Sequence, residues 1–186
     1  LRDGPEPART NIGETLAYVS DASPETVVDA VASQGFVKLF SGSGEQRRYA
    51  LIICSQAAEV TPAVVQPYIQ QIRAGVSPRH PPNERVAALA TLARLADESP
   101  GLVANRIDPL LETAAESDSR IRSNALGVAA IVARTHPDAV LDLRGVAAES
   151  LSAEQAGERI NAAELLYRLA HQRPDELAND GIKTRL

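Results

Sequence analysis

The chain has few of the residues that build reactive or cross-linked sites. It holds one cysteine, Cys54, which rules out an intramolecular disulfide and a cysteine-cluster metal site. Its histidines, His80, His136 and His171, have no spacing that would bring them to one metal ion. Gly-x-Ser-x-Gly, His-Glu-x-x-His and P-loop sequences do not occur. We therefore predict a protein that is not an enzyme and that needs no cofactor.

Aromatic residues and positive charge are also scarce. Aromatics make up 3% of the chain, tryptophan is absent, and the formal net charge is -5 with a pI near 5.3. Nucleic-acid-binding proteins usually show a basic surface and aromatic rings on which bases stack. The composition argues against nucleic acid as the main partner. The 17 arginines keep it as an alternative, in which the phosphate contacts would be Arg47, Arg48, Arg79, Arg94 and Arg168.

Long apolar runs are missing as well. No stretch reaches the roughly 20 residues that a helix needs to cross a bilayer, and no basic-then-apolar leader begins the chain. The first residue is Leu1 and not methionine. From these features we expect a cytoplasmic protein with no membrane segment, and a chain that is part of a longer product.

What the chain does contain is an internal repeat. A proline that can open a helix recurs at intervals of 38, 38, 37 and 37 residues, at Pro24, Pro62, Pro100, Pro137 and Pro174. An arginine stands fifteen residues before each proline, at Arg9, Arg47, Arg85, Arg122 and Arg159. Three residues after the arginine come Ala50, Ala88, Ala125 and Ala162, with Ile12 in the first copy. A fixed period in this range is typical of repeat arrays.

Each repeat predicts two helices. One starts at the proline, where Ser23, Thr61 or Ser99 offers a capping hydroxyl in three copies, and runs about a dozen residues to a polar turn. The other starts at the arginine, the first running from Arg9 to about Val19 and the last proline-led helix from Pro174 to about Thr184. We call them the proline-led and arginine-led helices. The pattern predicts an all-α chain of about ten helices.

The arginine-led helices have one apolar side. On a helical wheel an arc of roughly 140° holds the small and apolar residues of each copy. In the fourth copy these are Ile121, Arg122, Ala125, Leu126, Ala129, Val132 and Ala133, and other copies place Leu89, Leu92, Leu95, Ala163, Leu166 and Leu169 there. We interpret this arc as the buried face. The arginine lies within it and needs hydrogen-bond partners, so we interpret the arginine row as structural. The alternative is a row of arginines that binds a ligand.

The sequence Arg122-Ser-Asn-Ala125-Leu126, with its counterparts at Arg85 and Arg159, resembles the HEAT family of repeats and, less closely, the armadillo family. The match covers nearly the whole chain, 1–186, as a single repeat domain of about five repeats. The resemblance implies a right-handed α-α superhelix whose second helices line a concave side, and a role as scaffold or adaptor. HEAT repeats usually pair this arginine with an aspartate about six residues earlier. Only Asp3 and Glu116 fit here, so carbonyl partners are expected where Ser41, Arg79 and Ala153 occupy that position.

Neither terminal helix has the polar face of a capping repeat, so we expect neighbouring repeats or partner subunits to cover both ends. On the concave side we expect a protein or peptide to bind. The candidate partner-binding residues are Asn11, Tyr18, Tyr49, Ile52, Ile53, Gln56, Arg94, Asn124, Ile131, Asn161 and Arg168.

Two groups among these residues carry most of the hypothesis. Tyr49, Ile52 and Ile53 make the second arginine-led helix apolar almost all round, which suggests a hydrophobic partner site. The alternative is that a flanking helix buries them. Asn11, Asn124 and Asn161 lie at one offset, and such a row could bind an extended peptide, as armadillo grooves do. The alternative is that each amide bonds water or local backbone.

One further reading is enzymatic. Bilin lyases are built of HEAT-like units, so an accessory lyase or chaperone for a chromophore is the third hypothesis. Units of that type are usually near 30 residues, shorter than the copies in this chain.

Overall fold

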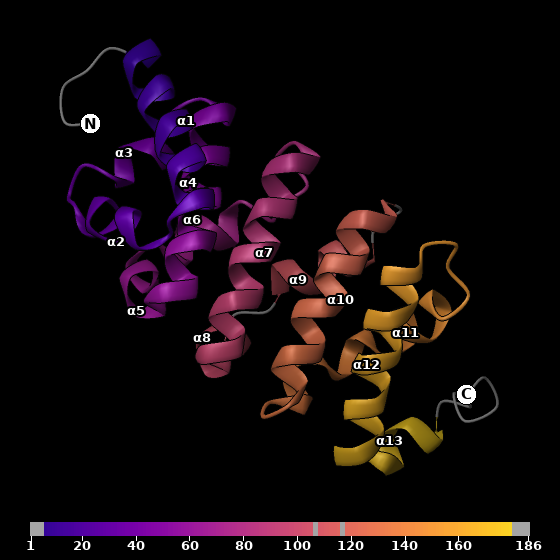
Figure 1. Ribbon diagram of the computed structural model, residues 1–186. Coiled ribbons are helices and arrows are strands. Elements are labelled where there is room, and N and C mark those ends of the chain that lie inside the picture. The colour runs from indigo at the N-terminus through magenta and orange to yellow at the C-terminus, as the bar shows by residue number, and fades with distance from the viewer. Residues whose placement is uncertain (1–5, 106–107, 116–117, 180–186) are drawn as a thin grey trace. The chain divides into compact units, whose positions relative to one another are not determined.

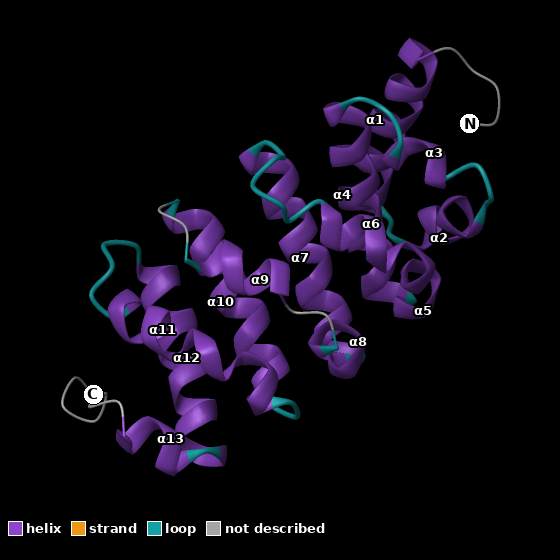
Figure 2. Cartoon of the chain, turned by 180° about the vertical axis from the view of Figure 1, so that it is seen from behind, coloured by secondary structure: helices purple, strands orange, loops and turns teal. Residues whose placement is uncertain are grey.

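The computed structural model of the protein describes residues 6–105, 108–115 and 118–179, and every regular element in those ranges is a helix (Figures 1 and 2). The all-α prediction is confirmed. The arginine-led helices are α1 (Glu6–Ala22), α4 (Gly44–Val60), α7 (Pro82–Glu98), α10 (Ser119–Ala133) and α12 (Ala156–Gln172). Each begins three residues before its arginine, so their starts repeat the period of the prolines.

The proline-led segments are not single helices. They are α2 (Glu25–Ala32) with α3 (Val37–Phe40); α5 (Pro62–Val65), η1 (Gln66–Tyr68) and α6 (Ile69–Ala74); α8 (Pro100–Ala104) with α9 (Asp108–Ala114); η2 (Pro137–Leu143) with α11 (Arg144–Ser150); and α13 (Pro174–Asn179). The expectation of one helix for each segment, and so of about ten helices, is wrong. Gly35 separates α2 from α3, and Pro67, which lacks an N–H, lies in the 3-10 turn of the second segment. Residues 180–184 of the last expected helix lie outside the described residues.

The expected hydroxyl caps do not form. Thr61 and Ser99 are the N-cap residues of α5 and α8, but their side chains make no capping hydrogen bond, and the N-cap of α2 is Pro24 in place of Ser23. At Thr61 and Ser99 the main-chain carbonyl accepts the N–H three residues on, at 3.0 Å in both cases. Side-chain capping occurs on the arginine-led helices instead, where Ser43 caps α4 and Asp118 caps α10.

The chain divides into two compact units, Leu1–Leu95 and Ala96–Leu186, and each is described by itself. In the first unit α1 packs along α4, and α2 packs against α4 and α5. Phe36 and Leu39 are fully buried beneath these helices. The ring of Phe36 meets Tyr68 edge-on at 5.3 Å, and the Tyr68 hydroxyl donates to the carbonyl of Val31 at 2.7 Å. These contacts hold the proline-led segments of the first two repeats together.

In the second unit α10 packs along α12, and α9 and α11 pack against α10 and α12 respectively. The apolar residues of the predicted arc of α10 are buried here, Arg122 within the arc is half-buried, and Val128 and Ala130 outside the arc are buried too. In α12 the residues Leu166 and Leu169 are buried as expected, but Ala163 is exposed. That expectation is wrong because, in the part of the chain that the structure describes, the side of α12 that carries Ala163 has no neighbouring helix.

Candidate partner-binding face

Four of the arginine-led helices, α4, α7, α10 and α12, carry half-buried side chains five and nine residues after the arginine, whereas on α1 these side chains are exposed. We call the half-buried positions the outward stripe. It consists of Ile52, Gln56, Ala90 and Arg94 in the first unit and of Gly127, Ile131, Glu164 and Arg168 in the second. Ala90 in the first unit and Gly127 in the second are small. Another chain could therefore approach the helix backbone closely at each of these positions.

The charged residues of the outward stripe are in ion pairs. Arg94 donates through Nε to the Ser55 hydroxyl at 2.9 Å and forms an ion pair with Glu59. Arg168 pairs with Glu164, one turn earlier on α12, at 2.7 Å. Such half-exposed ion pairs contribute little stability, but they leave the stripe with little net charge. Ile52 and Ile131 are thus the apolar side chains around which a partner could pack.

Tyr49 and Ile53 are not on this face. Tyr49 is 9% exposed and Ile53 is fully buried, so neither offers a surface to a partner in this structure. The reason is the neighbouring helix: a Cβ placed on Gly13 of α1 would lie 3.3 Å from the Cβ of Tyr49. Arg48 covers the ring, with its guanidinium carbon 5.0 Å from the ring centroid. The flanking-helix alternative for these two residues is therefore the correct one, and only Ile52 remains half-exposed.

The asparagine row does not form a common ligand-binding edge in the described residues. Asn124 donates to the carbonyl of Arg120 within its own helix at 2.8 Å. Asn161 donates to the carbonyl of Ser123 on the preceding arginine-led helix, also at 2.8 Å. Asn124 thus bonds local backbone, as the alternative interpretation has it, whereas Asn161 bonds the backbone of the neighbouring copy. Asn11 is exposed on α1, where Tyr18 is 81% exposed.

In the three copies that lack an acidic residue six positions earlier, the recurring arginine donates a hydrogen bond to a main-chain carbonyl oxygen. Arg47 donates to Gly42, Arg85 to Val76 and Arg159 to Ala153, at 2.7 to 2.9 Å. The expected carbonyl partners are confirmed. Asp3 and Glu116, the acidic residues expected beside Arg9 and Arg122, lie outside the described residues.

A second partner of the arginine row was not foreseen. Arg47 also donates to Glu84 at 3.1 Å, and Arg122 donates to Glu158 at 2.5 Å. Both glutamates directly precede the arginine of the next copy. Gln46 has the same place before Arg47 and donates to Thr10 of the first copy at 3.0 Å. An acid or amide one residue before the arginine is the sequence signal that could have predicted these links between copies.

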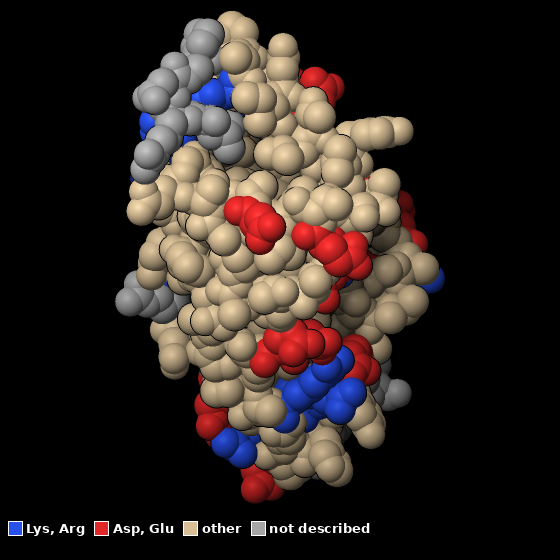
Figure 3. Space-filling model, turned by 60° about the vertical axis from the view of Figure 1, so that its left-hand side comes forward, with Lys and Arg blue, Asp and Glu red and all other residues tan. Residues whose placement is uncertain are grey.

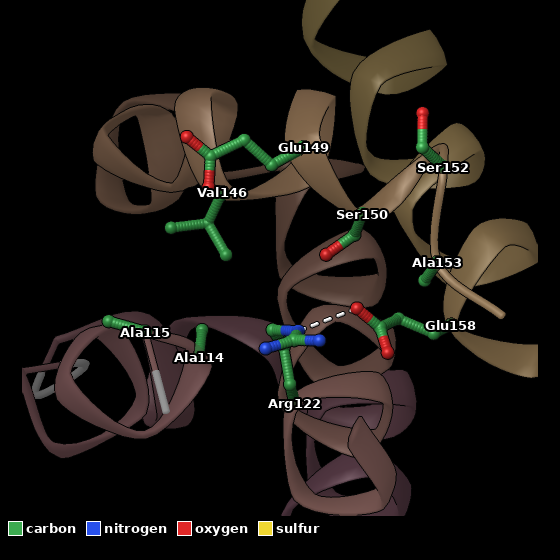
Figure 4. Close-up of a pocket in the computed structure, with 9 residues that line it drawn as sticks. All are labelled: Ala114, Ala115, Arg122, Val146, Glu149, Ser150, Ser152, Ala153 and Glu158. Carbon is green, nitrogen blue, oxygen red and sulfur yellow. Dashed lines mark hydrogen bonds and ion pairs between the residues drawn. The ribbon is translucent and has the colours of Figure 1, made fainter. Parts of the chain in front are cut away.

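Glu158 is the most deeply buried carboxylate of the second unit, with no exposed surface. Burial alone raises its pKa, but hydrogen bonds from Arg122, Ser119 and Ser150 outweigh that effect and hold the pKa below its ordinary value. In Figure 4 Arg122 and Glu158 point toward each other, and Ser150 lies above them on α11. The carboxylate is charged and its oxygens are satisfied, as a structural ion pair requires.

A cavity of about 340 Å³ adjoins this pair (Figure 4). It lies between the end of α9, the end of α11 and the turn before α12, and its lining residues are Ala114, Ala115, Arg122, Val146, Glu149, Ser150, Ser152, Ala153 and Glu158. The first unit has a cavity of about 270 Å³ at the corresponding place, beside Arg47 and Glu84 and between two proline-led segments. Because both cavities stand at the same position in the repeat, we interpret them as gaps produced by the packing of the copies.

The remaining candidate groups do not converge. Among the described residues, no three or more His, Cys, Asp and Glu side chains lie close enough to hold a metal ion. His80 pairs instead with Glu84 at 3.3 Å. Cys54 is fully buried, and its burial raises the pKa of the thiol well above the ordinary range. Its position fits a core residue.

The surface shows no broad field of one charge on the face drawn in Figure 3, where most of the blue side chains lie beside red ones. Three of the five arginines considered for nucleic-acid binding, Arg47, Arg94 and Arg168, are in ion pairs. None of the helices in the described ranges combines the length and apolar character that a bilayer crossing needs.

Comparison with known proteins gives a fold and no family. No family model matches the chain, and no curated protein matches it. Its structure is similar to a crystal structure described as an engineered protein, with a TM-score of 0.82 and 18% sequence identity over 96% of this chain and 81% of that one. At that identity the likeness shows the fold alone, an array of packed helices.

Proposed function

We propose that the chain is a non-enzymatic scaffold of the HEAT-repeat type that binds a protein or peptide partner. In this proposal the arginine-led helices line the concave side of a right-handed superhelix, and the outward stripe is the surface that meets the partner. We place the protein in the cytoplasm. The proposal rests on the repeat frame and on the HEAT-like residues around each arginine.

The observation that carries the proposal is the composition of the outward stripe. In the first unit Ile52 is half-exposed on α4, and the small residue Ala90 stands at the equivalent position of α7; in the second unit Ile131 is half-exposed one turn after Gly127 on α10. A partner's side chain can bury these isoleucines at a gain of about 25 cal/mol per Å² of apolar surface. The surrounding ion pairs and amides form the polar rim that protein interfaces usually have.

The test is affinity capture with the isolated chain as bait, compared with the variant Ile52→Asp/Ile131→Asp. An aspartate in a desolvated contact costs several kcal/mol, because its charge loses water without gaining a partner. We expect the proteins retained by the wild-type chain to be lost with the variant, as read by quantitative mass spectrometry.

The matched control is Val37→Asp, which places the same charge at an exposed apolar position of α3, away from the stripe. It should retain the captured proteins. Circular dichroism must show equal helix content for the three chains. A set of captured proteins that is the same for all three would remove the outward stripe as the binding surface.

A further inference from the structure

The last arginine-led helix, α12, carries an exposed apolar row. Ile160 is 67% exposed and Tyr167 is 62% exposed, and Ala163 lies between them on the same side of the helix. These residues stand one, four and eight positions after Arg159. Contiguous exposed apolar side chains of this size mark contact surfaces more often than solvent-facing ones.

On α1, α4 and α10 the same three positions are covered wholly or in part, because the next arginine-led helix of the same unit packs on them. In α1 they include Gly13 and Ala17, and in α10 they include Leu126 and Ala130, all of them buried. Gly13 approaches Tyr49 of α4, and Ser123 at the first of these positions bonds Asn161 of α12. The interface between successive arginine-led helices recurs within the chain, and we call the surface on which the next helix packs its forward half. The exposed row of α12 is such a forward half.

The backward half of that interface is exposed on α1. Its members in other copies are polar groups that reach back to the preceding helix: Asn161 donates to the carbonyl of Ser123 at 2.8 Å, and the Thr91 hydroxyl donates to the carbonyl of Leu51 at 3.0 Å. The residues at these positions of α1 are Asn11 and Thr15, and both are exposed.

Thr15 of α1 has the same side-chain hydrogen bond within its own helix as Thr91 of α7. Its hydroxyl donates to the carbonyl of Asn11 at 2.8 Å, just as Thr91 donates to Ala87 within its own helix at 2.9 Å. Thr91 is fully buried because its hydroxyl also contacts Leu51 on the preceding helix, whereas Thr15 is exposed. The rotamer that the interface needs is therefore already present on α1.

We propose that the two halves meet between copies of this chain, with α1 of one molecule docked on α12 of another. Asn11 would donate to the carbonyl of Ile160 as Asn161 does to Ser123, and Thr15 would donate to the carbonyl of Ala163 as Thr91 does to Leu51. Tyr18 would lie beside Tyr167, where Arg94 and Ser55 meet in the chain. The contact is head-to-tail, so each molecule keeps one free half and further copies add on.

A second copy is the occupant that the polar groups favour. Two α12 faces placed together would bring apolar rows into contact but would leave the side chains of Asn11 and Thr15 exposed to solvent. In the head-to-tail contact both find the backbone acceptors that their equivalents use. Ala8 precedes Arg9 in place of the glutamates found before Arg85 and Arg159, and Arg159 keeps its carbonyl bonds to its own turn. The contact therefore needs no new ion pair.

The experiment measures the mass of the purified chain by sedimentation velocity over roughly 1 µM to 1 mM, the range in which contacts of moderate free energy fill. We expect the mean mass to rise past that of a dimer. Thr15→Arg blocks the α1 half and Ala163→Glu blocks the α12 half, both at exposed positions, and each variant alone should stay monomeric. Val37→Glu on α3 is the control and should assemble like the wild-type chain.

An equimolar mixture of Thr15→Arg and Ala163→Glu tests whether the contact is head-to-tail, between α1 of one molecule and α12 of another. Each variant keeps the half that the other has lost, so the mixture should form 1:1 pairs and nothing larger. A wild-type chain that stays monomeric throughout the range overturns the proposal, as does a Thr15→Arg variant that still dimerises. This inference does not depend on the proposed partner, because the assay contains only the chain itself.

Discussion

Arg122 and Glu158 stand 36 residues apart in the chain, yet Arg122 Nε lies 2.5 Å from Glu158 Oε1 and joins α10 to α12. The same link joins Arg47 to Glu84 in the first unit. The recurring arginine therefore has two tasks. It closes the turn before its own helix through a carbonyl in several copies, and it connects to the next copy wherever an acid precedes the next arginine.

The variant Glu158→Gln should show how much the ion pair between Arg122 and Glu158 contributes to the unfolding free energy, because that contribution depends on pH. The native pKa of Glu158 is lowered, so its contribution to stability is complete above the unfolded value of about 4.3 and is lost as the pH falls through the lower native pKa. We expect Glu158→Gln to cost about 1–3 kcal/mol at neutral pH.

Urea unfolding at a series of pH values measures both curves. The difference in unfolding free energy between wild type and Glu158→Gln should shrink below about pH 4.3, where the carboxyl group of the unfolded chain begins to take up a proton while that of the native protein is still charged. A difference that stays constant down to pH 3 would show that the charge of Glu158 is not what stabilises the fold.

Arg85 and Arg159 occupy the same position of the repeat but different environments. Arg85 is 4% exposed and donates to the carbonyl of Val76, whereas Arg159 is exposed and bonds only the turn before its helix. Arg85→Ala should lower the unfolding free energy by about 2–3 kcal/mol, because the buried carbonyl loses its donor and the side chain loses its packing. Arg159→Ala should cost less than about 1 kcal/mol. Equal losses in thermal or urea unfolding would contradict this assignment.

Gly13 and Tyr49 form a matched small and large pair between α1 and α4. At the same two positions the next pair of copies has Leu51 and Ala87, the reverse arrangement. Gly13→Leu should destabilise the chain by about 1–3 kcal/mol, because its side chain meets the Tyr49 ring.

The double variant Gly13→Leu/Tyr49→Ala should recover part of the stability lost by Gly13→Leu. A double-mutant cycle from urea unfolding gives the coupling free energy, which we expect to be about 1 kcal/mol or more for residues in contact. Strictly additive effects would mean that the two side chains do not share a space.

Cys54 should behave as an inert core thiol. It is fully buried and its pKa is raised by burial, so little reactive thiolate is available to a disulfide reagent. Native protein should react over hours, and protein in denaturing urea within minutes. A Ser152→Cys variant in a Cys54→Ser background supplies the exposed control and should react rapidly without urea. Rapid labelling of the native wild-type chain would show that the second repeat opens.

The order of the helices was predictable because it depends on local patterns. The positions of Pro24, Pro62 and their equivalents predicted where the proline-led segments begin, and the spacing of apolar residues predicted the buried side of α7 and α10. Breaks within the proline-led segments were visible in the sequence at Gly35 and Pro67, but their effect depends on whether packing can keep such a helix straight.

Local patterns in the sequence were sufficient to predict an all-helical chain, its period and most of the buried arc, since propensity and a 3.6-residue periodicity act within one helix. The exposure of individual side chains, inside and outside the arc, depends on the neighbouring helices. Tyr49 is buried because α1 places a glycine against it, Asn161 is bonded because α10 offers a carbonyl, and Ala163 is exposed because its side of α12 has no such neighbour among the described helices. Each outcome depends on what a residue about 37 positions away contributes, and no pattern within a single helix contains that information.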